Sequence, residues 1–165
     1  MEEGVIMVYV KVDLGVVVQK SCAPEAGFIE APDYVCCGYL YDGVNFTAPP
    51  PTLAKVKIDQ STLISASAQT AIIGGFASAA LGASNTYPST LVDQQNINAV
   101  ALVGGSLWCA DATGKWSFMP HTKAQAASVQ ADMVAHIQTQ QAKNATKQAA
   151  LAAATTEADV AKVIW

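Results

Sequence analysis

Charge is scarce in this sequence, and the little that is present does not cluster. Only 13% of the 165 residues are charged, about half the usual share for a soluble domain, and the net charge is −4. No Lys/Arg cluster occurs, which disfavours a nucleic-acid partner because such binding needs concentrated positive charge. A free monomer with so few charges is poorly solvated, so we expect a homo-oligomer or a partner-bound component.

Long apolar runs are missing too. No run reaches the roughly 18 residues that a membrane-spanning helix needs, so we expect no membrane insertion. The first residues, Met1-Glu2-Glu3, have the wrong sign for the start of a secretory signal, and no small-residue cleavage site follows a suitable apolar stretch. We therefore expect a protein that is made and folded in a cytoplasm.

Cysteine and histidine are too few and too scattered to suggest a metal site. Cys36 and Cys37 are adjacent, whereas metal-binding cysteines usually lie two to four residues apart. Neither His121 nor His136 has a cysteine near it in the sequence. Free thiols acting as small core residues are the better interpretation of the four cysteines, Cys22, Cys36, Cys37 and Cys109. We predict no metal and no cofactor.

Catalytic patterns are absent from the sequence as well. It has no Gly-rich phosphate loop with its lysine, no His-Glu-x-x-His and no Gly-x-Ser-x-Gly. Asp13, Asp42 and Asp111 lie beside glycines or in turns, where a short carboxylate bonds its own backbone. His121 follows a proline at a helix entrance and can satisfy free backbone groups there. We therefore expect a protein that is not an enzyme.

The first part of the chain has the features of a small antiparallel β-module. Residues 5–20 contain two β-rich runs, and Asp42-Gly43 is a turn dipeptide placed directly before another such run. Pro49-Pro50-Pro51 cannot continue a strand or a helix, and these prolines form a stiff extended spacer. We predict a β-module over residues 1–48 and a proline-rich linker over residues 49–58.

The spacing of apolar residues changes after the linker and becomes helical. A helix is predicted over residues 59–81, although Gly74-Gly75 weakens it and can mark a break or a tight helix crossing. A loop is expected over residues 85–89, and a second helix over residues 92–103. Residues 59–165 thus predict a second domain that is mainly helical.

Two aromatic strands interrupt the helices. Residues 107–111 and 115–119 read as a β-hairpin, with Trp108 and Trp116 as stacked cross-strand neighbours. Core packing or hairpin pairing is the simpler role for these tryptophans. Alternatively, they line a sugar-binding surface, because aromatic ring faces stack on sugars.

The last section predicts the longest helix, over residues 122–153. Thr122 and Gln125 form a capping box, and the helix contains neither glycine nor proline. A short final helix is expected over residues 155–165. The whole chain is therefore predicted to be α+β, with the strands first and a long helix near the end.

One stripe of the long helix is apolar at its ends and polar in its middle. It suits either a weak coiled-coil seam or an exposed helix with one docked end. Its large apolar members form the candidate oligomer or partner interface: Val129, Met133, Ile137 and Leu151.

Several stretches together resemble a known group of proteins. Residues 38–46 (GYLYDGVNF), followed by prolines, look like the end of short N-terminal β-modules in phage tail-fibre accessory proteins. Residues 87–97 (YPSTLVDQQNI), 108–125 (WCADATGKWSFMPHTKAQ) and 154–165 (ATTEADVAKVIW) are similar to a C-terminal phage tail domain of unknown function. The likeness spans about residues 60–165, and the N-terminal module gives weaker support.

The resemblance implies a structural component of a bacteriophage tail, located in the virion and joining or tipping a tail fibre. The alternative is an assembly chaperone that binds the C-terminal end of the fibre, and a third role is a tip that binds a host-surface glycan. Expected partners are a tail-fibre or baseplate protein and further copies of the chain, with a trimer suggested by phage fibres. No catalytic residue carries over. The candidate aromatic contact surface comprises Trp108, Trp116, Tyr39 and Tyr41.

Overall fold

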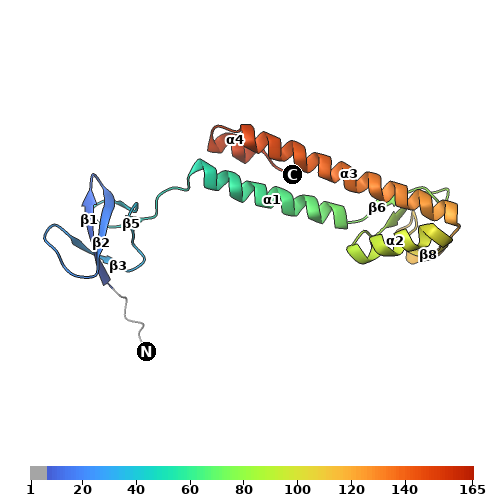
Figure 1. Ribbon diagram of the computed structural model, residues 1–165, viewed down its shortest axis with the longest axis horizontal. Helices are drawn as coiled ribbons and strands as arrows, with labels where there is room; N and C mark the ends of the chain where they lie inside the picture. Colours follow the sequence, from blue (N-terminus) through green and yellow to red (C-terminus); the bar gives the residue numbers. More distant parts are fainter. Residues whose placement is uncertain (1–6) are drawn as a thin grey trace, which may run out of the picture. The chain divides into compact units, whose positions relative to one another are not determined.

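A computed structural model describes residues 7–165 and divides the chain into two compact units, Met1–Thr52 and Leu53–Trp165. The predicted α+β class is confirmed, because the described residues form two antiparallel sheets and four helices, with the strand-rich part first (Figure 1). The boundary between the units lies inside the predicted linker, and each unit is described separately below.

Unit 1 is an antiparallel sheet of five short strands. They are β1 (Met7–Asp13), β2 (Val16–Ser21), β3 (Ile29–Pro32), β4 (Leu40–Tyr41) and β5 (Phe46–Thr47), in the order β3-β1-β2-β4-β5. The predicted turn at Asp42 joins β4 to β5. Its carboxylate accepts hydrogen bonds from the backbone N–H groups of Val44 (2.8 Å) and Asn45 (2.7 Å), as expected for a turn aspartate. Cys36 and Cys37 lie between strands, and both are exposed.

The core of unit 1 contains no large side chain. Its buried members are Val8, Val10, Val17, Ala31 and Val35. Alternation along β1 places Val8 and Val10 on the same face, as the period of two requires.

Unit 2 begins with α1 (Leu53–Ile73), which corrects the predicted bounds of 59–81 at both ends. Residues 53–58, assigned to the linker, are the first turns of this helix because Leu53 and Val56 pack against the core beneath them. The helix stops before Gly75, whose φ of +98° suits glycine and which has no room for a side chain. A Cβ there would lie 2.8 Å from the carbonyl oxygen of Tyr87.

Two short strands follow where a helix end and a loop were predicted. They are β6 (Phe76–Ser78) and β7 (Asn85–Tyr87), paired with Phe76 opposite Tyr87. In both strands the first and third residues are buried, which is the period of a strand and not of a helix. The prediction of a helix was therefore wrong beyond residue 73, and that of a loop was wrong for residues 85–87, whereas residues 88–89 are a loop as predicted.

The remaining elements agree with the sequence to within three residues. They are α2 (Leu91–Val103), β8 (Gly105–Ala110), β9 (Trp116–His121), α3 (Lys123–Ala153) and α4 (Glu157–Lys162). The capping box of Thr122 and Gln125 is confirmed at the start of α3. The cap of α4 is Thr156, and not Thr155.

Unit 2 has two cores, one near each end of its long helices. α1 and α3 run antiparallel side by side, with α4 at one end and the sheet with α2 at the other (Figure 1). The sheet order is β6-β7-β8-β9, and α2 and α3 pack on its inner face. The sheet core comprises Phe76, Tyr87, Ile97, Leu107, Cys109, Val129 and Met133, and the helical core comprises Ile64, Leu151, Ala154 and Val160.

Candidate binding surface on the outer face of the hairpin

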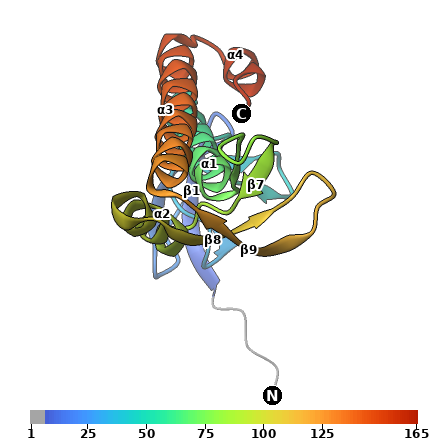
Figure 2. The same ribbon diagram turned by 90° about the vertical axis from the view of Figure 1, so that its right-hand side faces the viewer.

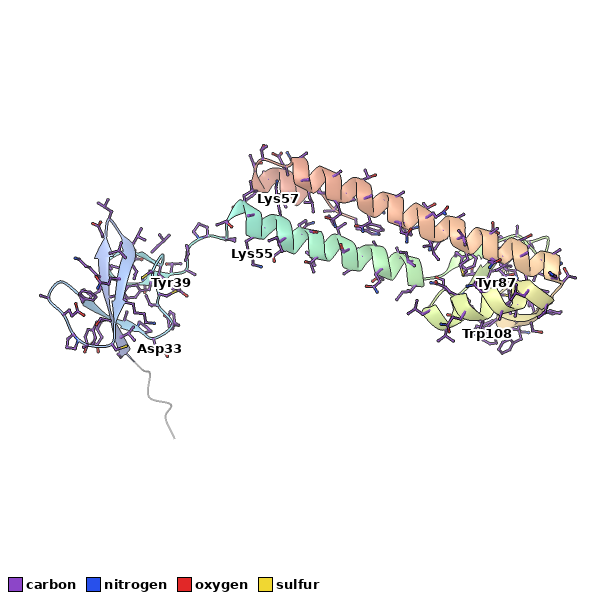
Figure 3. The ribbon with its side chains drawn as sticks, in the orientation of Figure 1. Asp33, Tyr39, Lys55, Lys57, Tyr87 and Trp108 are labelled. Carbon is purple, nitrogen blue, oxygen red and sulfur yellow. The ribbon has the colours of Figure 1, made fainter. Side chains whose placement is uncertain are left out.

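The β8–β9 hairpin places its largest side chains on the outside. Alternation along the strands buries Leu107 and Cys109 on the inner face and turns Trp108 outward. Trp108 and Trp116 are each 42% exposed, and Phe118 is 70% exposed. Figure 2 looks along α1 and α3 and shows this hairpin extending across the end of the helices, and Figure 3 labels Trp108 at the same end of unit 2.

The three outer rings form one continuous patch centred on Trp108. Its ring centroid lies 6.1 Å from that of Trp116, with 21° between the planes, and 5.0 Å from that of Phe118, at 57°. Register places Trp108 opposite Phe118 and Trp116 opposite Ala110. The predicted stacking of the tryptophans is thus confirmed, but they are diagonal neighbours and not directly opposed.

A cleft of about 240 Å³ opens beside this patch. It exists because β7 pairs with β8 at one position only, Thr86 with Ala110, before the chain turns away at Pro88 towards α2. The first half of β8 therefore has no strand on that side among the described residues. The cleft is lined by Pro88, Asp93, Asn96, Ile97, Ser106, Leu107, Trp108 and Phe118.

The polar side chains of the cleft have spare hydrogen-bonding capacity. Asp93 uses Oδ2 to accept from the backbone N–H and the hydroxyl of Thr90 in the capping box of α2, and its Oδ1 accepts nothing from the described residues. The side chains of Asn96 and Ser106 also have no hydrogen bond to the described part of the chain. No lysine, arginine or histidine lines the cleft. The surface therefore combines aromatic rings, unused neutral polar groups and one carboxylate.

The inner face of the sheet holds the hairpin in place through a buried polar network. The Nδ1 of His121 lies 2.8 Å from the carbonyl oxygen of Met119, and since a carbonyl only accepts, Nδ1 carries the proton. Nε2 is then the acceptor for the hydroxyl of Tyr87, at 2.8 Å. His121 lies at a helix entrance as predicted, directly before the N-cap Thr122 of α3, and it is also the buried last residue of β9.

Burial also determines how the inner face titrates. Desolvation, with a smaller contribution from the neighbouring Cys109, raises the pKa of the Tyr87 phenol well above its usual value. Desolvation likewise raises the pKa of the Cys109 thiol, against hydrogen bonds from Tyr87 and Asn85 that lower it. Both groups are therefore neutral and structural at physiological pH.

The predicted stripe on α3 is covered within the chain. Val129 and Met133 belong to the sheet core, and Leu151 belongs to the helical core. Their partners are residues of the same unit, so these three side chains are not free to pack against another copy. Ile137 is partly buried, and it lines a second, uncharged groove of about 570 Å³.

The two predicted tyrosines belong to unit 1. Tyr39 packs against the valine core and lies 6.3 Å from Tyr34 by ring centroids. Tyr41 stacks on Phe46 at 4.5 Å, and its hydroxyl donates to the carbonyl of Gly43 at 2.7 Å. Contacts within unit 1 thus account for both rings.

Sequence reasoning missed three members of the surface. Phe118 lies two residues after Trp116, so strand alternation could have placed it on the same face. Asp93 and Asn96 share a helix face at spacing i, i+3, but the sequence does not say which face of α2 meets the hairpin.

Two general searches over residues 7–165 gave no candidate. No group of three or more His, Cys, Asp or Glu residues in this range could hold a metal ion. None of the helices described is long and apolar enough to cross a membrane.

Comparison with known proteins gave one match. The model of a family described as a domain of unknown function (DUF4376) matches residues 55–163, which lie within unit 2. No curated protein and no solved structure matches the chain.

Proposed function

Because this chain belongs to the DUF4376 family, whose function is unknown, we propose a role from its own residues: a non-catalytic structural protein of a bacteriophage tail. In this proposal it is associated with the tail fibre, and the outer hairpin face of unit 2 is its contact surface. The observation that supports it best is the patch of three exposed, mutually packed rings, Trp108, Trp116 and Phe118. Tryptophan-rich patches of this kind are typical of the centres of protein interfaces.

The tail setting comes from the resemblance of residues 87–97, 108–125 and 154–165 to a phage tail domain. The non-catalytic part is supported by structural roles for the titratable side chains. Asp42 and Asp111 each bond a turn, the Asp159 carboxylate accepts from the hydroxyl of Thr156 at the N-cap of α4, and His121 is held by Tyr87. Each of these groups stabilises the fold locally.

The experiment is co-expression with a tail-fibre protein from the same genome, followed by co-purification. We expect a complex that Trp116→Ala weakens, because Trp116 belongs to the patch without lining the cleft. Tyr34→Ala is the matched control, since Tyr34 is an exposed aromatic residue of unit 1 (61%). If the wild-type protein and the Trp116→Ala variant bind the fibre protein equally, the aromatic patch is not the contact surface.

Mass spectrometry of purified virions separates the structural role from the chaperone alternative. A structural component is present in mature particles in a fixed ratio to the fibre. A chaperone binds the fibre protein in the co-purification but is absent from the particles. If the chain neither binds the fibre protein nor occurs in the particles, both roles are excluded.

A homo-oligomer remains part of the proposal, with a trimer favoured, but through different residues. The uncharged groove at Ile137 is continued by the exposed side chains of Ile73, Leu91 and Val92. A second copy can pack there without burying a charge. Light scattering should show an oligomer that Leu91→Glu dissociates, whereas Leu14→Glu, at an exposed turn of unit 1, leaves it intact. A wild-type monomer at micromolar concentration would contradict this part.

A further inference from the structure

The cleft beside Trp108 differs from the rest of the aromatic patch in having polar groups among its lining residues. α2 contributes Asp93 and Asn96, and β8 contributes Ser106. The Oδ1 atom of Asp93 and the side chains of Asn96 and Ser106 lack partners among the described residues, whereas the capping box already fixes the position of the Asp93 carboxylate. A ligand here meets the aromatic side chains of Trp108 and Phe118 together with hydrogen-bond donors and acceptors.

The spacing of Trp108 and Trp116 excludes a ligand held between these two rings. Their near-parallel rings have centroids only 6.1 Å apart. A group held between two parallel rings needs about 7 Å, which is twice the carbon–carbon contact distance. Of the two tryptophans only Trp108 lines the cleft, so a ligand there packs against Trp108 and not between the rings.

The charge of the cleft restricts the ligand further. Its lining contains one carboxylate and no basic residue, so phosphates and acidic sugars meet repulsion without a compensating cation. A volume of about 240 Å³ is also below the roughly 300–1,000 Å³ of sites for drug-sized molecules. The occupant is accordingly small and not anionic.

From these observations we propose that the cleft binds one neutral pyranose ring. The apolar C–H face of the sugar packs on Trp108, with Phe118 closing the side. Its hydroxyls donate to Oδ1 of Asp93, and they exchange hydrogen bonds with the amide of Asn96 and the hydroxyl of Ser106. This proposal goes beyond the tail role and does not depend on it.

The test is saturation-transfer NMR on the full chain with the methyl glycosides of glucose, galactose and mannose, and with glucuronic acid. We expect at least one neutral glycoside to bind with a Kd of about 1 mM, and glucuronic acid to give no transfer. Asn96→Ala should weaken binding about tenfold, because it removes one polar partner without changing the fold. Trp108→Ala should abolish binding.

The matched control is Gln95→Ala, on the same helix and equally exposed but outside the cleft. It should keep the wild-type Kd within about twofold. Circular dichroism confirms that each variant is folded. The site is overturned if no neutral glycoside binds the wild-type protein, if glucuronic acid binds more tightly, or if Gln95→Ala and Asn96→Ala weaken binding equally.

The outcomes for this cleft and for the fibre contact are separable. Trp116→Ala weakens the fibre complex but leaves glycoside binding, whereas Asn96→Ala does the reverse. Loss of sugar binding with an intact fibre complex would remove the sugar site alone.

Discussion

The two faces of the β8–β9 hairpin reverse the usual relation between size and burial. Cys109 and Leu107 are buried on the inner face, whereas Trp108, Trp116 and Phe118 remain exposed on the outer one. Burying an aromatic side chain stabilises a fold more than burying a thiol, so a sequence shaped only for stability would place the large rings inside. This difference between the two faces is the observation from which both proposals start.

The largest expected effect on stability comes from truncating one residue of the inner face, and truncating its neighbour on the outer face gives the comparison. Leu107→Ala should lower the free energy of unfolding of unit 2 by about 2–5 kcal/mol, because it leaves a cavity between the sheet and α2. Trp108→Ala removes a larger side chain, yet should cost less than Leu107→Ala, because the Trp108 side chain is 42% exposed and its removal leaves no enclosed cavity. Chemical denaturation followed by tryptophan fluorescence measures both variants, because all three tryptophans, Trp108, Trp116 and Trp165, lie in unit 2.

The two variants also separate stability from binding. Leu107→Ala should bind its partners at temperatures where it is folded, whereas Trp108→Ala should be stable and inactive in binding. If Trp108→Ala proved as unstable as Leu107→Ala, the outer face would belong to the core, and the contrast between the faces would disappear.

A smaller loss of stability is expected from the polar network of the inner face. Tyr87→Phe removes the hydroxyl that donates to Nε2 of His121, and it leaves a buried acceptor without a partner. The expected cost is about 1–3 kcal/mol. The same fluorescence titration measures it, and the double variant Tyr87→Phe/His121→Phe should recover part of the loss. An unchanged stability in Tyr87→Phe would mean that this hydrogen bond contributes nothing net.

Alkaline pH should weaken the inner face and leave the outer one unaffected. The folded-state pKa values of Cys109 and Tyr87 are raised, so above their ordinary values of about 8.5 and 10 the unfolded chain releases protons that the folded chain retains. Stability is complete below those values and falls as pH rises, by up to about 1.4 kcal/mol per pH unit for each group. Denaturation curves between pH 8 and pH 11 should show this fall, and Cys109→Ala should delay its onset. A flat profile in the wild-type protein would contradict the burial of both groups.

Prediction from the sequence succeeded where the signal was local. The capping box of Thr122 and Gln125 gave the start of α3, and strand alternation around Gly114 gave the hairpin. β6 and β7 were missed because three residues are too few to show a period, and because α3, distant in sequence, buries one face of β6. Phe76 was therefore assigned to the predicted helix over residues 59–81.

The same limit applies to the candidate surface. A stripe on α3 was recognisable, but whether Val129 and Met133 meet another copy or this chain's own sheet depends on tertiary packing. Trp108 and Trp116 could be named as candidates because both are aromatic residues of a predicted hairpin. Asp93 and Asn96 were not, since the rotation of α2 about its axis is set by Ile97 packing into the sheet core.

The smallest effect concerns the turn that joins the two strands of the hairpin. The carboxylate of Asp111 accepts from the backbone N–H groups of Thr113 (2.8 Å) and Lys115 (3.1 Å), and from the Thr113 hydroxyl (2.6 Å). The hydrogen bond from the Thr113 side chain contributes most to holding the pKa of Asp111 below its usual value. The Asp111 carboxylate therefore contributes its stabilisation above the pKa of the unfolded chain, about 4. This stabilisation is lost as the pH falls through the lower pKa of the folded state.

Asp111→Ala should accordingly lower the melting temperature of unit 2 slightly at neutral pH and have less effect in acid, where the carboxylate of the wild-type protein is protonated. Asp42 is the matched residue in unit 1, since it makes the same kind of turn and its pKa is also lowered, chiefly by the backbone of Asn45. Asp42→Ala should leave the fluorescence melting curve unchanged, because no tryptophan lies in unit 1. A pH-independent effect of Asp111→Ala would show that the turn is held by Gly114, and not by the charge on the carboxylate.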